Sequence, residues 1–478
     1  MNREEYEAKM KQGMEDIVTD VSQFVADSVM LNAKIREMPI NPSNADGAEF
    51  IKKSEIPAYG RDTDEIGREL IEYVFDNALL CQHPRFFSFV PGAVSPHSLV
   101  GAILADVYNF HGGGWSEAPG ACAIEEKLIQ WMGGLAGYDT EKCGGIFMSG
   151  GSMANMSAMI AARDTKLGEK YFPIGTVYLS DQAHSSVRKG IRMIGFRNDQ
   201  QVLVPTDDNF RMRTDLLEKA IEEDIAAGKK PFAVVASMGT TNTGSIDDLY
   251  KIGMIAQKYN LWFHVDGAFG GSMLLTKNYK SFIKGIELSD SLSWDTHKWL
   301  MQVYSCSSLI VKDKQTLINS FAEHPEYLDD LYDQDHVDPW NLGPEMTRPH
   351  RAIKLWCTIQ AMGTEMLSYV VDYSVNNAFI ALDELLRHPN WDIISKPSCG
   401  TINFRYAPSS LTKEEIDDLN GQISKEINDT GYAYIVTTKL KGKRVLRICA
   451  INANTTADDV RSTIIKLDEI AQRLTNNI

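Results

Sequence analysis

The sequence has no long apolar run, no excess of basic residues and no closely spaced cysteine pairs. No apolar run approaches the roughly 18 residues that a membrane span needs, and the charged start lacks the apolar core of a secretion signal. The net charge of −16 argues against nucleic acid or an anionic membrane as a partner, because both attract clusters of Lys and Arg. Seven singly placed cysteines fit reduced thiols and not a disulfide framework or a zinc site. We therefore predict a soluble cytoplasmic protein without a metal site.

The chain has the composition of an ordinary globular protein and is long enough for several domains. Apolar residues make up 44% and charged residues 23% of the 478 residues, which is typical of a folded protein of two or three domains. Between Met14 and Met30 the apolar residues recur at helical spacing, so a helix there must bury one face. We predict a helical N-terminal arm over residues 1–85.

The rest of the chain divides into two further parts. From about residue 120 to 312, helices alternate with short apolar strands, the pattern of a mainly parallel sheet covered by helices. We predict a large α/β domain over 86–347 and a small α+β domain over 348–478. The expected strands span 145–149, 176–180, 201–204, 232–237 and 261–265 in the large domain, and 402–406, 433–436 and 445–449 in the small one.

The most informative stretch runs from Ser293 to Trp299, where Lys298 stands between His297 and Trp299. Burial lowers the pKa of a lysine because the charged form loses its hydration, and a neutral amine can attack a carbonyl. A lysine of this kind can form a Schiff base with a cofactor or substrate. On these residues alone, a partly buried lysine whose stem packs on Trp294 or Trp299 is the favoured interpretation.

A second stretch, Trp262 to Ala268, is an apolar strand that ends in Asp266. Ligands of open α/β sheets bind beyond the C-terminal ends of the strands. A lone Asp there can simply cap a turn. Together with a Schiff-base lysine, it has a specific role, which is to keep the ring nitrogen of pyridoxal phosphate protonated.

These two stretches, in this order and at this spacing, resemble the group II pyridoxal-phosphate decarboxylases, which make amines from amino acids. The resemblance extends from His83 to about Ala450 and is greatest to the bacterial tryptophan decarboxylases. It implies a fold type I (aspartate aminotransferase-like) enzyme with pyridoxal 5'-phosphate (PLP) as cofactor. It also implies a homodimer with shared active sites, in which the N-terminal arm wraps around the second subunit.

The resemblance places the cofactor at the ends of five strands. Gly151 and Ser152 would hold the phosphate where a glycine turn enters a helix, a favourable place for an anion. His184 and Ala268 would pack on the two faces of the ring, and Thr241 would lie near its phenolic oxygen. The full expected cofactor-binding set is Gly151, Ser152, His184, Thr241, Asp266, Ala268 and Lys298.

The same resemblance implies an aromatic substrate, with tryptophan first and phenylalanine or tyrosine next. The implied substrate-binding residues are Phe89, Val90, Pro91, His111 and Trp340, with His111 serving the site of the neighbouring subunit. His297 would contact the substrate or move protons.

An acidic stretch with Tyr and Pro, residues 322–346, breaks the helix and strand pattern and predicts a lid. The resemblance implies that a lid tyrosine protonates Cα of the substrate. Tyr327 fits the bacterial enzymes better, and Tyr332 is the alternative.

The resemblance leaves two questions open, one about the phosphate site and one about the reaction. Asp295 stands where the animal relatives have Asn, so a carboxylate near the phosphate needs a partner or some distance. The fold also supports aminotransferases and carbon–carbon lyases, and Arg351 could bind the α-carboxylate that an aminotransferase holds. A scaffold without activity is disfavoured because Lys298 and Asp266 are both present.

Overall fold

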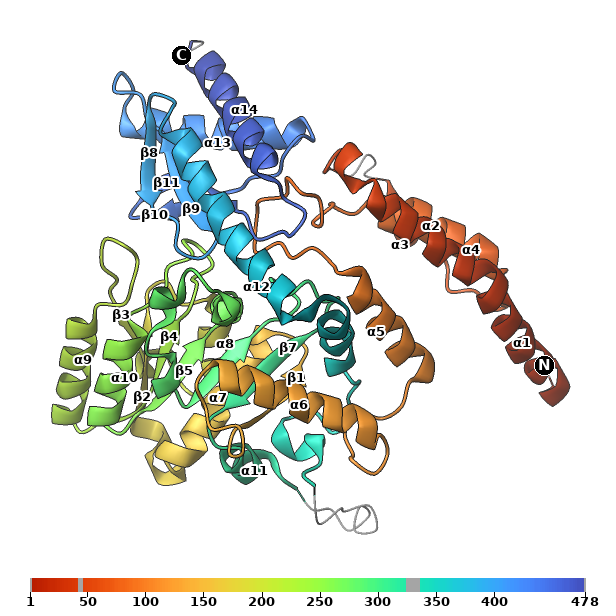
Figure 1. Ribbon diagram of the computed structural model, residues 1–478, viewed down its shortest axis with the longest axis horizontal. Coiled ribbons are helices and arrows are strands. Elements are labelled where there is room, and N and C mark those ends of the chain that lie inside the picture. The colour runs from red at the N-terminus through yellow and green to blue at the C-terminus, as the bar shows by residue number, and fades with distance from the viewer. Residues whose placement is uncertain (1, 42–45, 324–335, 477–478) are drawn as a thin grey trace.

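The computed structural model describes residues 2–41, 46–323 and 336–476. Three parts follow one another: a helical arm, a large domain around a seven-stranded sheet and a small domain around a four-stranded sheet. The long helix α12 (Ala352–Leu385), interrupted at Gly363, runs from the large domain into the small one (Figure 1). No helix in these described ranges is both long and apolar enough to cross a membrane.

The arm contains four α-helices and extends away from the rest of the chain (Figure 1). Its first helix begins with a capping box between Asn2 and Glu5, which satisfies the free N–H groups of the first turn. The expected apolar stripe lies on this helical segment but stays exposed: Met14 is 65%, Val18 73% and Met30 64% accessible. The described α-helices of the arm are α1 (Arg3–Asp16), α2 (Ser22–Ala33), α3 (Gly47–Lys53) and α4 (Thr63–Leu70).

The large sheet has the strand order β1-β7-β6-β5-β4-β2-β3. The five neighbouring strands β3, β2, β4, β5 and β6 pair in parallel. Strand β7 is antiparallel to both of its neighbours, β1 and β6. This confirms the mainly parallel sheet, although β7 was not expected. The strands are β1 (Gly144–Met148), β2 (Gly175–Ser180), β3 (Gln201–Val204), β4 (Lys230–Ser237), β5 (Trp262–Asp266), β6 (Ser291–Trp294) and β7 (Ser307–Val311).

Helices cover both faces of this sheet, so its central strands are apolar on both sides. Along β4, Val234 and Ala236 belong to one core and Ala233 and Val235 to the other, as the two-residue period of a strand requires. The first core includes α6 (Pro119–Leu135), α9 (Thr214–Ala226) and α10 (Leu249–Lys258). The second includes α7 (Gly151–Lys166), α8 (Ser185–Met193) and α11 (Gln315–Phe321).

The small sheet has the order β10-β11-β9-β8, and α12, α13 and α14 share its core. The strand expected at 433–436 is wrong: Tyr434 forms only an isolated bridge with Phe86, the side chain of Asn428 binds the backbone of Ile435, and pairing with β11 begins at Thr437. Strand β8 was missed. The elements are β8 (Trp391–Ser395), β9 (Thr401–Tyr406), α13 (Lys413–Asp429), β10 (Thr437–Leu440), β11 (Lys443–Cys449) and α14 (Ala457–Thr475).

The segment at the start of the predicted large domain is bound to the small domain. Phe87 donates its N–H to Tyr434 and accepts from the N–H of Cys449, and its ring lies in the core of the small domain. The predicted start of the large domain at residue 86 is therefore not what the structure shows. The segment around Phe87 packs with residues of the small domain that follow it by more than 340 positions.

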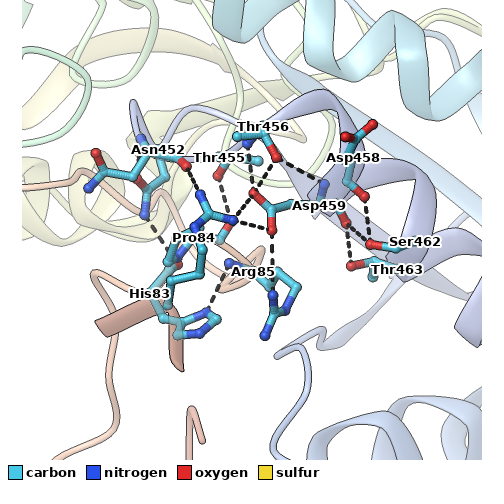
Figure 2. Close-up of polar contacts among 12 residues, drawn as sticks. His83, Pro84, Arg85, Asn452, Thr455, Thr456, Asp458, Asp459, Ser462 and Thr463 are labelled. Atoms are coloured by element: carbon cyan, nitrogen blue, oxygen red, sulfur yellow. Dashed lines mark hydrogen bonds and ion pairs between the residues drawn. The ribbon is translucent and has the colours of Figure 1, made fainter. Parts of the chain in front are cut away.

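A buried carboxylate ties the exit of the arm to the last helix (Figure 2). Asp459 lies in the first turn of α14, accepts from Thr456 in a capping box and forms an ion pair with Arg36 at 2.6 Å. Arg85 lies 3.5 Å from the same carboxylate. Burial acts to raise the pKa of Asp459, but the hydrogen bonds from Arg36 and Thr456 outweigh it, and the pKa lies below its ordinary value.

We expect Asp459→Asn to lower the free energy of unfolding by about 1.5–3 kcal/mol, the usual contribution of hydrogen bonds to a charged group. Because the folded pKa is lowered, the contribution is present above the unfolded pKa of about 3.9 and is lost as the pH falls toward the folded value. Chemical denaturation followed by tryptophan fluorescence measures it. Asp458→Asn is the control, since Asp458 is 94% exposed; equal losses in both variants would contradict the assignment.

Candidate active site

Lys298 lies just after β6, at the C-terminal edge of the parallel strands. Its Nζ is 2.8 Å from Oδ2 of Asp295, and its side chain is 24% exposed. Its neighbours Trp294 and Trp299 are fully buried in the core. The tryptophans therefore anchor the segment, and the lysine reaches the edge of the sheet.

The predicted lowering of the Lys298 pKa is wrong for the protein without cofactor. Burial acts to lower the pKa of Lys298, but the charge of Asp295 and its hydrogen bond raise it, helped by the charge of Asp266. The net pKa lies above the ordinary lysine value. The partner that Asp295 was expected to need is thus Lys298 itself.

Asp266 is the last residue of β5 and is 8% exposed. The parallel register pairs it with Ser293 on β6, whose Oγ donates to Oδ1 at 3.3 Å. The backbone N–H of Ala268 donates to the same oxygen at 3.1 Å. The second oxygen is left to contact a ligand beyond the strand end.

A glycine turn and a helix start form the opposite end of the site. Helix α7 begins at Gly151, and its N-cap residue Gly150 has no side chain that could cap the free N–H groups of the first turn. A Cβ on Gly151 would lie 2.8 Å from Cβ of Ala268 and 3.0 Å from each carboxylate oxygen of Asp295. Glycine is therefore required at this close approach, and the uncapped N–H groups with the exposed Ser152 can hold a phosphate.

Two more of the predicted residues follow neighbouring strands. His184 comes after β2, is exposed, and binds Ser186 through Nδ1 at 2.7 Å at the start of α8. Thr241 follows β4 and is half-buried. The ring of His184 is therefore free to cover a planar ligand at the edge of the sheet.

His297 is buried between Asp295 and a second aromatic ring. Its Nδ1 accepts from the N–H of Cys306 at 3.2 Å, so a neutral ring carries its proton on Nε2, which lies 3.6 Å from Oδ2 of Asp295. Burial lowers the pKa of His297 and favours this neutral form. The ring centroid is 4.9 Å from that of Tyr304, which is 71% exposed and was not predicted as a site residue.

The predicted substrate segment lies directly on the lysine segment. A Cβ on Gly92 would clash with the carbonyl oxygen of Lys298. Phe89 has a φ of 54° and exposes 60% of its surface, whereas Val90 is half-buried and Pro91 buried. The exposed rings of Phe89 and Tyr304 thus belong to segments in contact with the residues around Lys298.

Arg447 on β11 is a functional candidate that the sequence analysis missed. It is 4% exposed, and its Nη1 donates to the carbonyl oxygen of Phe89. Its Nε and Nη2 find no hydrogen-bond acceptor of normal geometry among the described residues, although the thiol of Cys449 lies close enough to act on the pKa of the guanidinium. Burial lowers the pKa of this guanidinium. The available signal was an arginine in the middle of the apolar strand that runs from Val445 to Cys449.

Other predicted residues lie elsewhere or are otherwise engaged. His111 binds Glu117 through Nδ1 at 2.5 Å, and its ring centroid is 5.9 Å from that of Trp340, which is 3% exposed. Arg351 forms two hydrogen bonds to Glu345, at 2.7 and 2.9 Å, so its guanidinium is already paired. Tyr327 and Tyr332 lie outside the described residues.

The residues present fit PLP. Lys298 can bind an aldehyde covalently, and Asp266 can pair with a pyridinium nitrogen. The turn at Gly151 leaves room for a phosphate because glycine has no side chain there. Lysine, carboxylate and uncapped helix at one edge of a mainly parallel sheet define a fold type I PLP enzyme.

Comparison with known proteins identifies the family. The model of the pyridoxal-dependent decarboxylase conserved domain matches residues 51–407. An aromatic-L-amino-acid decarboxylase of Bacillus atrophaeus is 33% identical over 422 residues, 88% of each chain. An L-2,4-diaminobutyrate decarboxylase of Acinetobacter baumannii is 29% identical over 432 residues, 86% of this chain and 84% of that one.

The structure is similar to that of Oryza sativa TDC solved with PLP and tryptamine, with a TM-score of 0.89 and 25% identity over 95% of this chain and 98% of that one. The chain belongs to the pyridoxal-dependent decarboxylases. It is a carboxy-lyase with PLP as its cofactor.

We expect Asp266→Asn to keep its bound cofactor, visible by absorbance, and to lose turnover by about 10- to 150-fold. The carboxylate contributes a charge-assisted hydrogen bond of roughly 1.5–3 kcal/mol, which acts on the rate if it is needed only in the transition state. Steady-state kinetics measures the loss. The control is Asp290→Asn, at the other end of β6, which should keep the turnover of the wild type. If Asp266→Asn also kept that turnover, another carboxylate would have this role.

Proposed function

We propose that this decarboxylase acts on an aromatic L-amino acid, with tryptophan, converted to tryptamine and carbon dioxide, as the first candidate. One observation carries the proposal: the exposed rings of Phe89 and Tyr304 lie on segments that contact the residues around Lys298, and the buried guanidinium of Arg447 lies against the Phe89 backbone. Aromatic rings favour an aromatic side chain, and a guanidinium favours a carboxylate. Phenylalanine and tyrosine are the next candidates.

Each residue contributes a step that its position allows. PLP, when bound, accepts the electrons left at Cα after carbon dioxide departs. Asp266 keeps the proton on the ring nitrogen, and Arg447 orients the substrate carboxylate with its unpaired N–H groups. His297 presents its Nε2–H to the site. From the resemblance, Tyr327 delivers the proton to Cα.

The competing reactions have less support. An aminotransferase that used Arg351 to hold the α-carboxylate would have to break its paired hydrogen bonds to Glu345. A diaminobutyrate decarboxylase, which the 29% identical relative exemplifies, acts on an amine-bearing side chain. The exposed rings of Phe89 and Tyr304 favour an apolar, planar group instead.

The test is a screen of the twenty amino acids and 2,4-diaminobutyrate for carbon dioxide and amine release, combined with Arg447→Lys. Tryptophan should give the highest kcat/KM. Because lysine cannot reproduce the planar donor pair, Arg447→Lys should raise KM for tryptophan by about 10- to 150-fold. The control is Arg444→Lys on the same strand. Arg444 donates its hydrogen bonds to Asp417, so this change should leave KM nearly unaltered. Preferred turnover of diaminobutyrate, or keto acid as the product, would contradict the proposal.

We also propose a homodimer with shared active sites. The apolar surface of the arm needs a partner, and helix α5 (Pro96–Tyr108) adds Val107 and Tyr108, which are 73% and 71% exposed. Exposed apolar surface of this extent is typical of a subunit interface. His111, just beyond α5, would serve the site of the second subunit.

Mixing two inactive variants tests the sharing of sites. Lys298→Ala abolishes one site, and His111→Ala should impair the neighbouring one. Subunit exchange between them places one intact lysine and one intact histidine in a single site of a mixed dimer. One of the two sites of a mixed dimer is then intact, so activity should return to at most about half of the wild-type value per dimer. No recovery, or an active monomer in sedimentation, would contradict the shared site.

We propose a cytoplasmic location as well. All seven cysteines lie in the described part of the chain and are free thiols. Compartments that oxidise thiols favour disulfides, so a chain with this many unpaired cysteines suits a reducing compartment. Separating cell fractions and locating the activity tests this.

A further inference from the structure

Asp295 is a buried charge at the phosphate end of the site whose role is not yet assigned. Its side chain is 4% exposed. Oδ2 pairs with Nζ of Lys298 at 2.8 Å, and Oδ1 accepts from Oγ of Ser307 at 2.5 Å. In the protein without cofactor, the positive charge of Lys298 therefore balances this carboxylate.

The same carboxylate borders the position expected for the phosphate. Both of its oxygens lie 3.0 Å from the position that a Cβ on Gly151 would take. Gly151 opens α7, whose first N–H groups have no side-chain cap and attract an anion. Two anionic groups this close in a buried site do not both stay ionised easily, and one of them tends to take up a proton.

The other charged groups around Asp295 do not replace Lys298. His297 faces Oδ2 at 3.6 Å, but its Nδ1 already accepts from Cys306, so protonating the ring would break that hydrogen bond. Asp266 adds a second negative charge near Lys298, and burial raises the pKa of Tyr304, which stays a neutral phenol. Of the two groups that donate hydrogen bonds to Asp295, the hydroxyl of Ser307 is too weak an acid to give up its proton, which leaves the ammonium group of Lys298.

We propose that Lys298 gives a proton to Asp295 when the cofactor is loaded, and that Asp295 then remains a neutral carboxylic acid beside the phosphate. Lys298 transfers one ammonium proton to Oδ2 across the 2.8 Å hydrogen bond. Its freed electron pair bonds to the aldehyde carbon of PLP, and the aldehyde oxygen leaves as water with the two protons that remain on nitrogen. Charge is conserved, because one ion pair becomes two neutral groups.

This step has two effects at once. The amine becomes a nucleophile, which its raised pKa otherwise prevents, and the carboxylate stops repelling the phosphate and can donate a hydrogen bond to it. Asp295 is thus a positioning residue for the cofactor. The inference rests on the PLP cofactor and not on the proposed aromatic substrate.

Infrared difference spectroscopy between the enzyme with and without PLP tests the proposal, with no amino acid added. Loading should produce the C=O stretch of about one protonated carboxyl per chain. Labelling aspartate carboxyls with ¹³C should shift this band and leave glutamate and cofactor bands in place. The band should be absent from Asp295→Asn and present in Asp290→Asn, whose carboxyl lies at the other end of β6.

Visible absorbance of bound PLP in each sample shows that loading has occurred. A loaded wild type without a label-sensitive band would overturn the proposal, because Asp295 would then have stayed ionised. A band that survives in Asp295→Asn would assign the proton to another aspartate and overturn it equally. A second variant, Ser307→Ala, tests the assignment if Asp295→Asn does not fold. It keeps Asp295 but removes the hydrogen bond to Oδ1, so the C=O band should move in frequency. A band that does not move would count against the assignment.

Discussion

The site depends on the parallel pairing of β4, β5 and β6. The register places Ser237 opposite Asp266, and Asp266 opposite Ser293. The parallel strands end at the same edge, so the residues that follow them, including Thr241 and Lys298, emerge at that edge of the sheet. A slip of one residue would turn the apolar side chains of a strand to the wrong core, and since both faces of these strands are buried, the two cores hold the register.

A second constraint joins the two domains at the site. The ring of Phe87 is buried in the small domain, while Phe89, two residues later, is exposed and Gly92 of the same segment contacts the backbone of Lys298 in the large domain. Arg447 reaches from β11 to the carbonyl of Phe89. A shift of the small domain would therefore move both the aromatic segment and the guanidinium relative to the lysine, so the geometry of the proposed substrate site depends on the position of that domain.

The sequence allowed the sheet and the cofactor end of the site to be predicted, because both depend on local patterns. Apolar runs mark the strands, and polar residues such as Asp266 and Lys298 follow them directly. Arg447 could not be found this way, since its importance comes from a contact with Phe89, which is distant in the chain. Tyr304 was missed because it lies in a loop without a regular pattern and approaches His297 only once that loop is folded. The strand expected at 433–436 failed for a related reason: the side chain of Asn428 replaces a neighbouring strand as the partner of Ile435. The raised pKa of Lys298 was likewise hidden, because composition does not show how close the carboxylate of Asp295 lies.

The buried charges of the large domain and the site fall into two kinds. Arg348 and Glu125 form a fully buried pair with two hydrogen bonds, at 2.7 and 3.0 Å, and further bonds to the backbone of Phe147. The two charges of that pair balance each other, although Nε of Arg348 finds no hydrogen-bond acceptor among the described residues. Arg447, by contrast, has unpaired N–H groups among the described residues, and Asp295 is balanced only by a lysine that must react. Because an uncompensated buried charge costs several kcal/mol, Arg447 is unfavourable in the folded chain without a ligand. A ligand that supplies a negative charge binds the folded state alone and so stabilises it, which supports the proposal that Arg447 receives the substrate carboxylate. At Asp295 the situation is the reverse, because the lysine already balances the carboxylate and the phosphate adds a like charge, which the proposed proton transfer from Lys298 offsets.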